Sequence, residues 1–401
     1  MGEDPGRNPF EFHLKTHLVF GAGSALSLAK HLREMTRRRI GIIVDPAVES
    51  SDYVQQILGG IRDEAFEDTR VWVYDVRGEP DYDSLDRVIS LFRDFRGAPT
   101  VDCFVGIGGG SVIDLAKGLA TLATNPGHAI RYRGFPTGLH PPLPVIAIPT
   151  TAGTGSEVTY NAVFIDRGEK RKLGINTLQN FPALAVLDPN LIISCPPPVL
   201  VSSGIDSLVH AVESFAAMKS NPLTRVFARA AVSRTYPALS RVLDEQGDPA
   251  LLADLQLGAY LAGISLMNSG SGPAGALSYP LGVHFRVPHG LAGGIFLAPL
   301  VRHNVAKGFD YSELHDAAGG EAGSMTRERK NRDFVGMLES LSRKLGIPRD
   351  LGVLGVNRGN VAPLLRDIEG LGAAFAQNPV EFTVEDGKNM VLSMIDGMPE
   401  G

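Results

Sequence analysis

The sequence has little cysteine and no strong excess of either charge. Its 401 residues include two cysteines, Cys103 and Cys195, so neither a disulfide framework nor a CxxC metal site is expected. This composition fits a reducing compartment. The formal net charge of −6 gives no electrostatic reason to expect binding to nucleic acid or to an anionic membrane surface.

The sequence also lacks segments that direct a chain to a membrane. No uncharged apolar run reaches the roughly 20 residues of a membrane-spanning helix. The first residues, Met1–Gly6, contain neither a basic segment nor an apolar one, so we expect no signal peptide and a cytoplasmic protein. Because dimers are the commonest assembly of soluble proteins, a homodimer is the default expectation.

The first half of the chain alternates short β-branched runs with helical patterns. The predicted strands are Arg39–Val44, Arg70–Val76, Val101–Ile107 and Pro144–Ile148. Helical patterns lie between them, for example at Asp83–Phe95 and Ser111–Ala123. The strands are continuous apolar runs, as in a sheet that is covered on both faces. This alternation predicts an α/β domain with a parallel sheet.

The pattern changes at Pro196–Pro198, which can continue neither a helix nor a central strand. The segments that follow have long helical patterns: Leu200–Met218, Pro222–Val242, Ala250–Met267, Arg332–Leu345 and Val361–Phe375. Small residues at Asn268–Gly275 predict a loop or a broken helix. We therefore expect an α/β domain over 1–195 and an all-α domain over 196–401.

A glycine-rich turn follows the predicted strand Val101–Ile107. It contains Gly108, Gly109 and Gly110 and leads into a helix. Glycines let the backbone approach a ligand closely, and the start of a helix suits a pyrophosphate. Ser111 and Asp114 have the spacing of a capping box, which predicts that they start the helix. A close-packed corner between strand and helix is the alternative interpretation.

Two more polar features follow strands of this sheet. The loop after Ile148 contains Thr150, Thr151 and Thr154, whose hydroxyls could contact a nucleotide. Asp45 ends the first predicted strand, where an acid can bind a ribose diol and repel a 2′-phosphate, favouring NAD over NADP. The alternatives are an ordinary polar loop and a turn Asp before Pro46.

In the second half, Asp206 and His210 lie four residues apart in a helical pattern. Side chains at this spacing share one helix face, so the pair can hold one ion or one reacting group. A hydrogen-bonded pair without further function is the alternative.

Together these pieces resemble the iron-containing (group III) alcohol dehydrogenase family of the dehydroquinate-synthase-like superfamily. The motifs that carry the resemblance are Val19–Gly23, Gly108–Lys117, Pro149–Glu157, Asp206–Glu213 and Pro288–Gly290. The resemblance implies a nucleotide-binding α/β domain, a helical domain and an active site in the cleft between them. It also implies NAD(P)-dependent interconversion of an alcohol and an aldehyde or ketone.

The resemblance also implies cofactor contacts at particular positions. Asp45 matches the acid that selects the cofactor, and Lys172 matches a lysine that reaches the nucleotide ribose. Glu79 stands where the family often has an Asn, which puts that contact in doubt. The remaining candidate cofactor-binding residues are Gly108, Gly109, Gly110, Ser111, Asp114, Thr150, Thr151 and Thr154.

Family members that use a metal hold it with one Asp and three His. Here Asp206, His210 and His289 match three of these positions, whereas Gly275 stands at the fourth. Tyr279 replaces a further His that is common in the family. With a metal retained, two imidazoles and a carboxylate are a familiar ligand set for catalytic Zn²⁺ or Fe²⁺.

With the metal lost, His210, His289 or Tyr279 would act as the general acid and base, as in metal-independent maleylacetate reductases. If the metal is retained, His284 is a candidate replacement ligand. For Glu213 a solvated side chain is the favoured interpretation, with orientation of the His210 imidazole as the alternative. Rival functions are an NAD-binding lyase or cyclase and a non-catalytic relative.

Overall fold

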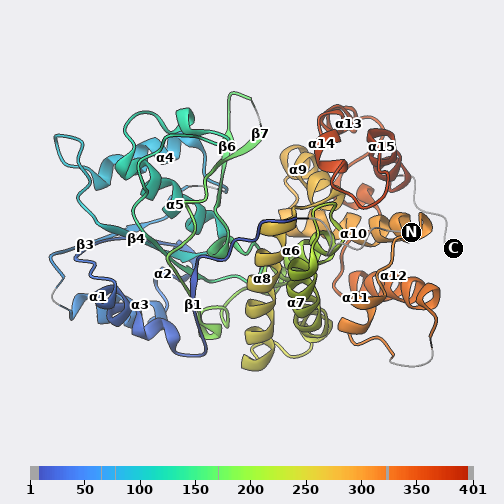
Figure 1. The fold of residues 1–401 in the computed structure, drawn as a ribbon, viewed down its shortest axis with the longest axis horizontal. Coiled ribbons are helices and arrows are strands. Elements are labelled where there is room, and N and C mark those ends of the chain that lie inside the picture. Colours follow the sequence, from blue (N-terminus) through green and yellow to red (C-terminus); the bar gives the residue numbers. More distant parts are fainter. Residues whose placement is uncertain (1–8, 65, 77, 170, 322–324, 396–401) are drawn as a thin grey trace. The chain divides into compact units, whose positions relative to one another are not determined.

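A computed structural model of the chain describes residues 9–395 except 65, 77, 170 and 322–324. The fold consists of two compact units (Figure 1). The α/β unit covers Leu14–Cys195, and the helical unit joins the residues up to His13 to Pro196–Gly401. The segment Met1–Gly6, on which the expectation of no signal peptide depends, lies outside the described residues.

The α/β unit contains a six-stranded parallel sheet with the order β1-β8-β5-β4-β2-β3. Its strands are β1 (His17–Phe20), β2 (Arg39–Val44), β3 (Asp68–Val73), β4 (Cys103–Gly108), β5 (Val145–Pro149) and β8 (Leu184–Leu187). The predicted parallel sheet is thereby confirmed. Because β3 and β4 lie on opposite sides of β2, the strand order reverses between β2 and β4, which is where ligands of open α/β sheets bind.

Helices cover both faces of this sheet (Figure 1). Helices α1 (Leu28–Glu34) and α3 (Asp52–Arg62) lie on one face, and α4 (Tyr82–Ile89) and α5 (Gly110–Thr124) lie on the other. Successive strand residues alternate between two cores, because side chains of a strand point to opposite faces. Val105 packs with the α1 and α3 side chains, whereas its neighbour Phe104 packs with those of α4 and α5.

Four strands were not predicted from the sequence. β1 lies at the sheet edge and has only four residues, so its apolar run is too short to mark a strand by pattern alone. β8 is a buried apolar run of four residues, which its pattern alone does not distinguish from part of a buried helix. β6 (Asn161–Asp166) and β7 (Arg171–Asn176) form a separate antiparallel hairpin, in which β6 alternates buried and partly exposed residues. A short alternating run between polar residues gives a weak strand signal.

The helical unit contains α6 to α15 among its described residues. They are α6 (Pro197–Ala216), α7 (Pro222–Arg241), α8 (Pro249–Ser269), α9 (Pro273–Phe285), α10 (His289–Ala306), α11 (Ser312–Ala317), α12 (Arg327–Lys344), α13 (Ala362–Glu369), α14 (Gly372–Phe375) and α15 (Val384–Ser393). Proline stands at the first position of α6 to α9, where its missing N–H costs nothing. The all-α prediction for this region is confirmed.

Short helices complete the described elements. α2 spans Pro46–Glu49, and 3-10 helices lie at Ser24–Ser27, Ser90–Phe92, Ala129–Tyr132, Ser156–Val158, Pro189–Leu191 and Leu351–Leu354. α8 is long and apolar enough to cross a membrane by length and composition alone. However, 61% of its most apolar window is buried inside the fold, as in the core helix of a globular unit.

The first described residues pack on the helical unit. The backbone N–H of His13 donates to Oδ1 of Asn268 at 2.6 Å, and Nδ2 of Asn268 donates to the carbonyl oxygen of His13 at 3.0 Å. Phe12 stacks on Phe227 with ring centroids 5.7 Å apart. The sequence predicted that these residues belong to the α/β domain, whereas their contacts are with α7 and α8.

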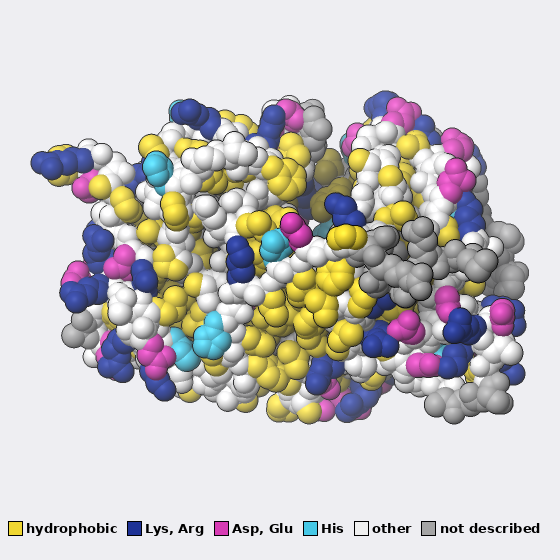
Figure 2. Space-filling view, in the orientation of Figure 1, with side chains coloured by type: hydrophobic (Ala, Val, Ile, Leu, Met, Phe, Trp, Pro, Cys, Tyr) yellow, Lys and Arg dark blue, Asp and Glu magenta, His cyan; other side chains and the backbone are white. Residues whose placement is uncertain are grey.

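Basic and acidic side chains are interspersed on the face drawn in Figure 2. Ion pairs among the described residues include Arg234 with Asp254 at 2.6 Å and Arg229 with Glu313 at 2.8 Å. Exposed pairs of this kind contribute little to stability, about 0–1 kcal/mol each.

Candidate active site

The glycine-rich turn lies between β4 and α5. A Cβ atom added at Gly108 would lie 2.6 Å from Cγ2 of Val112, and one at Gly110 would lie 2.7 Å from Cγ2 of Thr154. These two glycines therefore serve close packing, as the alternative interpretation proposed. At Gly109 the nearest atom, in Thr151, would be 3.5 Å away, so packing does not require a glycine there.

The start of α5 differs from the predicted capping box. The helix begins at Gly110 with Gly109 as its N-cap, and no side chain caps it. Ser111 lies inside the first turn, and the Asp114 carboxylate binds other groups. The prediction that Ser111 and Asp114 start the helix was wrong, because glycine can end a strand and open a helix without a side-chain cap. The uncapped start of α5 retains the backbone N–H groups that suit a pyrophosphate.

Asp45 lies at the carboxyl end of β2, beside the glycine turn. Its Cβ would be 3.0 Å from a Cβ atom added at Gly108. Its Oδ1 accepts a hydrogen bond from the backbone N–H of Ala47 at 2.9 Å, which makes Asp45 the N-cap of α2. The alternative role as a turn residue is thus present. It is compatible with cofactor selection, because a carboxylate has two oxygens.

The threonine loop after β5 is bound to the glycine turn. The backbone N–H of Thr150 donates to the carbonyl oxygen of Gly108 at 3.0 Å. Thr150 is buried, Thr151 is partly buried and Thr154 is exposed. Oγ1 of Thr154 accepts from the backbone N–H of Ser156 at 3.2 Å. The structure therefore brings the predicted glycine and threonine residues together at the carboxyl ends of the neighbouring strands β4 and β5.

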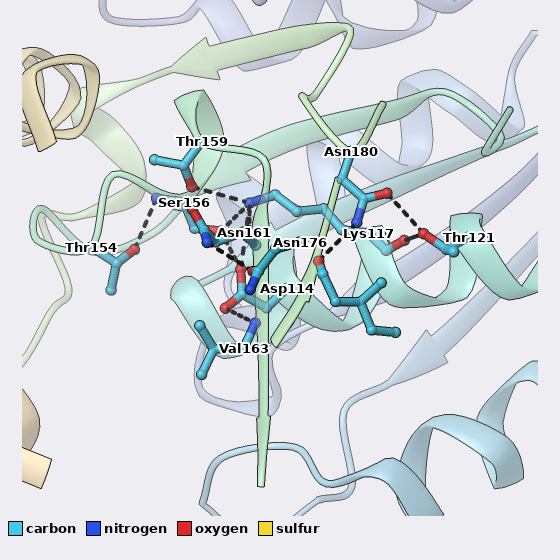
Figure 3. Close-up of polar contacts among 11 residues, drawn as sticks. Asp114, Lys117, Thr121, Thr154, Ser156, Thr159, Asn161, Val163, Asn176 and Asn180 are labelled. Carbon is cyan, nitrogen blue, oxygen red and sulfur yellow. Dashed lines mark hydrogen bonds and ion pairs between the residues drawn. The ribbon is translucent and has the colours of Figure 1, made fainter. Parts of the chain in front are cut away.

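A buried polar network fixes these loops (Figure 3). The Lys117 ammonium donates to Oγ of Ser156 at 2.7 Å and to the carbonyl oxygen of Asn161 at 2.8 Å. The Asp114 carboxylate accepts from the hydroxyl of Ser156 and from the backbone N–H of Val163, the latter at 3.0 Å. The network links α5 to the threonine loop and to β6.

Asp114 is a buried member of this network. Burial raises the pKa of Asp114 and lowers the pKa of Lys117, while the attraction between the two charges opposes both shifts. Protein donors surround the Asp114 carboxylate on α5. These hydrogen bonds hold the threonine loop and β6 against α5, and the contact of Asp114 with the cofactor stays a prediction. Sequence reasoning did not identify Lys117, whose burial no local pattern indicates.

Lys172 lies on β7 and pairs with Glu79, the residue that stands where the family often has an Asn. Its Nζ is 2.6 Å from Oε1 of Glu79, and only 16% of its side chain is exposed. The lysine that the resemblance assigns to the nucleotide ribose is therefore held by a carboxylate.

The helical unit brings Asp206, His210 and His289 together. Their ligand atoms lie within 4.8 Å of one another. Oδ1 of Asp206 is 3.6 Å from Nε2 of His210 and 3.7 Å from Nε2 of His289. These separations exceed a hydrogen bond and match the edge of a tetrahedron, about 3.4 Å for metal–nitrogen bonds near 2.1 Å.

The donor set also fits a metal ion chemically. It consists of one carboxylate and two imidazoles, which Zn²⁺ and Fe²⁺ both accept. Asp206 and His210 are buried on α6. The Nδ1 atom of His210 is buried and has no hydrogen-bond partner among the described residues. The residues present therefore fit the metal that the resemblance implies.

Close packing of α10 on α6 places His289 in this triad. His289 is the first residue of α10, and a Cβ atom added at Gly290 would lie 2.0 Å from the carbonyl oxygen of Ser202. The backbone N–H of Leu291 donates to Oγ of Ser202 at 3.2 Å. The glycine after His289 thus permits the approach that brings His289 to Asp206.

Tyr279 stacks on His289, with ring centroids 5.0 Å apart and planes inclined by 34°. The residue is 39% exposed, so it is not a core residue. Ser278, which the sequence did not single out, contacts Nδ1 of His289 at 2.7 Å. A serine inside an apolar helix gives no sequence signal for such a contact.

Glu213 binds the start of α9 instead of orienting His210. Its carboxylate accepts from Oγ of Ser271 at 2.7 Å and from the backbone N–H groups of Gly272, Ala274 and Gly275 at 3.0, 2.6 and 3.2 Å. Burial raises the pKa of Glu213, and these donors oppose the shift. The expectation of a solvated Glu213 was wrong, because the residue is buried. The alternative, a partner of His210, was wrong as well, because the N-terminus of α9 offers stronger partners to an anion.

His284 does not join the triad. Its Nε2 lies 2.7 Å from Oδ2 of Asp367 on α13, and the described metal-type cluster contains Asp206, His210 and His289 alone. The fourth family position, Gly275, supplies no ligand.

The α/β unit thus has a sheet of the type that binds dinucleotides, and the helical unit holds a carboxylate–imidazole triad. The family model for iron-containing alcohol dehydrogenases matches residues 15–189, and the C-terminal model of the same family matches residues 200–394. The chain belongs to the iron-containing alcohol dehydrogenase family.

Individual relatives agree with this assignment. Long-chain-alcohol dehydrogenase 1 of Geobacillus thermodenitrificans is 30% identical over 373 residues, which cover 91% of this chain and 92% of the relative. The structure of 1,3-propanediol oxidoreductase superposes with a TM-score of 0.89 at 24% identity, covering 97% and 100% of the chains. Sulfoacetaldehyde reductase from Bifidobacterium kashiwanohense, solved with NAD⁺, has a TM-score of 0.85 at 24% identity and covers 96% and 99%.

Proposed function

We propose that the chain is an NAD-dependent dehydrogenase that interconverts an alcohol with its aldehyde or ketone at a divalent metal held by Asp206, His210 and His289. The observation that carries the proposal is the triad. Its three ligand atoms lie within 4.8 Å of one another, and Oδ1 of Asp206 is 3.6 Å from Nε2 of His210 and 3.7 Å from Nε2 of His289. Three protein ligands are typical of catalytic zinc sites, which keep one position open for water or substrate.

The α/β unit supplies the cofactor site in this proposal. NAD, when bound, accepts hydride from the alcohol or returns it to the carbonyl compound. The uncapped start of α5 faces the same sheet edge as Asp45 and the threonine loop, and we assign the pyrophosphate to Gly109, Gly110 and Ser111. The Asp45 carboxylate would accept hydrogen bonds from a ribose and repel a 2′-phosphate, so NAD is the proposed cofactor.

The helical unit supplies the chemistry at oxygen. The metal, when bound, polarises the carbonyl oxygen or stabilises the alkoxide. Asp206 contributes a negative charge from α6, and His210 and His289 contribute neutral nitrogen donors. Tyr279, partly exposed and stacked on His289, is the proposed residue that holds or passes the hydroxyl proton. We propose Fe²⁺ or Zn²⁺, because both accept this donor set.

The named relatives act on alcohols and aldehydes of different length and charge, from long-chain alcohols to sulfoacetaldehyde. The proposed substrate class is therefore alcohols in general and their carbonyl counterparts, without a particular member. A cytoplasmic location and a homodimer stay predictions from the sequence.

The test combines cofactor binding, turnover and metal content. Calorimetry should detect NAD binding, and NADH should accumulate with an alcohol from a broad panel. Chelation should abolish turnover, and Fe²⁺ or Zn²⁺ should restore it. His210→Ala should lose the metal, whereas His284→Ala, which removes an imidazole outside the triad, should keep it.

Three results would overturn parts of this proposal. Unchanged turnover in a metal-free preparation would favour a metal-independent reductase. NAD binding without turnover or net NADH would favour a lyase or a binding protein. No affinity for either nicotinamide cofactor would remove the dehydrogenase proposal altogether.

A further inference from the structure

The hydroxyl of Ser278 makes two short contacts at once. Its Oγ lies 2.6 Å from the carbonyl oxygen of Gly275 and 2.7 Å from Nδ1 of His289. Ser278 is buried, with 1% of its surface exposed, so water does not compete for these partners. Both distances are typical of strong hydrogen bonds, and each contact needs a proton between its two heavy atoms.

The number of available protons decides which atom donates in each of these hydrogen bonds. A serine hydroxyl has one proton, and a carbonyl oxygen can only accept. The contact with Gly275 therefore takes the Ser278 proton. The contact with His289 must then use a proton of the imidazole, so Nδ1 of His289 donates to Oγ of Ser278.

We infer that Ser278 is a positioning residue that fixes the tautomer of His289, with the proton on Nδ1 and the lone pair on Nε2. Nε2 is the atom that lies 3.7 Å from Oδ1 of Asp206 in the triad. Only a nitrogen with a lone pair can bind a metal. Ser278 thus directs the ligating nitrogen of His289 to the triad. This inference rests on the proposed function, because it concerns a ligand of the proposed metal site.

The helix that carries Ser278 is anchored by a residue of α6. Ser278 lies on α9, whose first turn is held by the four hydrogen bonds to Glu213. Glu213 belongs to the same helix as Asp206 and His210. One helix therefore carries two ligands and also anchors the helix that orients the third. Partners of this kind hold metal-binding imidazoles in one orientation and tautomer.

The two imidazoles of the triad differ in this respect. Nδ1 of His289 has the Ser278 hydroxyl as a partner, whereas Nδ1 of His210 has none among the described residues. His210 is held instead by its place on a buried helix. The inference therefore predicts an effect that is specific to His289.

The test measures metal affinity and tautomer in separate experiments. Metal-stripped protein is titrated with Zn²⁺ in competition with a chromophoric chelator. Ser278→Ala should bind Zn²⁺ roughly 10–100-fold more weakly, the usual effect of removing such a partner. Ser278→Thr keeps the hydroxyl and should restore the affinity. Ser214→Ala is the matched control, because Ser214 is buried on α6 and makes the same kind of bond, to the carbonyl oxygen of Ala211 at 3.1 Å.

The tautomer is read from long-range ¹H–¹⁵N spectra of metal-free protein with labelled histidine, with the His289 signals assigned through His289→Asn. The wild type should carry the proton on Nδ1, and Ser278→Ala should lose this preference. A merely structural role would lower the melting temperature without changing the tautomer. If Ser278→Ala does not fold, Ser278→Cys, a similar side chain with a weak acceptor, takes its place.

A proton on Nε2 in the wild type would overturn the inference, as would a Ser278→Ala variant with wild-type Zn²⁺ affinity and tautomer. A wild-type protein that binds no Zn²⁺ would refute the proposed metal site, while the spectra would still decide the tautomer. The two failures are therefore distinguishable.

Discussion

Gly290 lies so close to Ser202 that a Cβ atom at position 290 would be 2.0 Å from the carbonyl oxygen of Ser202. The same atom would lie 2.7 Å from the Cβ of Asp206. The obstacle is backbone, which cannot move aside as the end of a side chain can. Any side chain at position 290 must therefore push α10 away from α6, and His289 with it.

We expect Gly290→Ala to destabilise the protein by at least the 1–3 kcal/mol that is usual for overpacking and to weaken metal binding by the triad. Urea unfolding and Zn²⁺ titration would measure both effects. Gly293→Ala on the same helix is the control, because its nearest contact would be an ordinary 3.5 Å. Equal stability and equal metal affinity in the two variants would show that α10 does not depend on this close approach.

Asp45→Asn should relax the cofactor preference without loosening α2. Asparagine caps a helix as well as aspartate does, so the bond to Ala47 can persist while the negative charge disappears. The ratio of kcat/KM for NADP to that for NAD should rise by roughly tenfold, equivalent to about 1.4 kcal/mol of relieved repulsion. Glu49→Gln changes the net charge equally on the same short helix and should leave the ratio unchanged. An unaltered ratio in Asp45→Asn would mean that another residue selects the cofactor.

Glu157 should give stability a pH dependence. Burial raises its pKa from 4.5 to about 7, and the attraction to Lys117 only partly opposes the shift. In the unfolded chain Glu157 ionises near pH 4.5, whereas in the folded protein it keeps its proton until about pH 7. Folding therefore binds a proton in this window, and the contribution of Glu157 to stability falls as the pH rises from about 4.5 to 7.

Glu157→Gln should remove this dependence. Between pH 4.5 and 8, the free energy of unfolding of the variant should rise relative to that of the wild type by on the order of 3 kcal/mol. This rise would be measured as a growing difference between the unfolding midpoints of the two proteins. Glu385→Gln, which removes an exposed carboxylate on α15, is the control and should show a constant difference. A constant difference for Glu157→Gln as well would mean that its carboxyl group titrates alike in the folded and unfolded states.

Restoring a histidine at position 275 should require a second change. A Cβ atom there would lie 2.5 Å from Oγ of Ser271 and 3.0 Å from Oε2 of Glu213. We expect Gly275→His alone to lower the melting temperature, and the pair Gly275→His with Ser271→Ala to recover part of the loss. Because the new side chain fills space, the pair should also accept a narrower range of alcohols, checked on the substrate panel. An additive response of the two substitutions would contradict the predicted coupling.

Much of the fold follows from patterns that the chain carries locally. Arg39–Val44 is a strand with the predicted bounds. A short, continuous apolar run of β-branched residues between polar residues is typical of a buried strand. The long helices α6, α7 and α8 were predicted within a few residues of their ends, since proline marks each start. The edge strand β1 and the β6–β7 hairpin were not predicted, because their burial depends on distant partners.

The candidate site also contains residues that local spacing predicts and residues that only tertiary packing brings together. Asp206 and His210 share a helix, so their spacing alone places them together. His289 joins them through the close packing at Gly290, which the family motif indicates and spacing does not. The contacts of Ser278 and Lys117 could not be predicted from the sequence, because the groups that they bind are set by how α9 and α5 pack.

The residues before Leu14 have a consequence for dissecting this protein. Because Phe12 and His13 pack on α7 and α8, the chain passes between the two units twice, once near position 13 and once near 195. A fragment that starts at Pro196 would expose the ring of Phe227 and strip Asn268 of two hydrogen bonds. To be excised intact, the helical unit must keep its opening residues, for instance by a short linker in place of everything from Leu14 to Cys195.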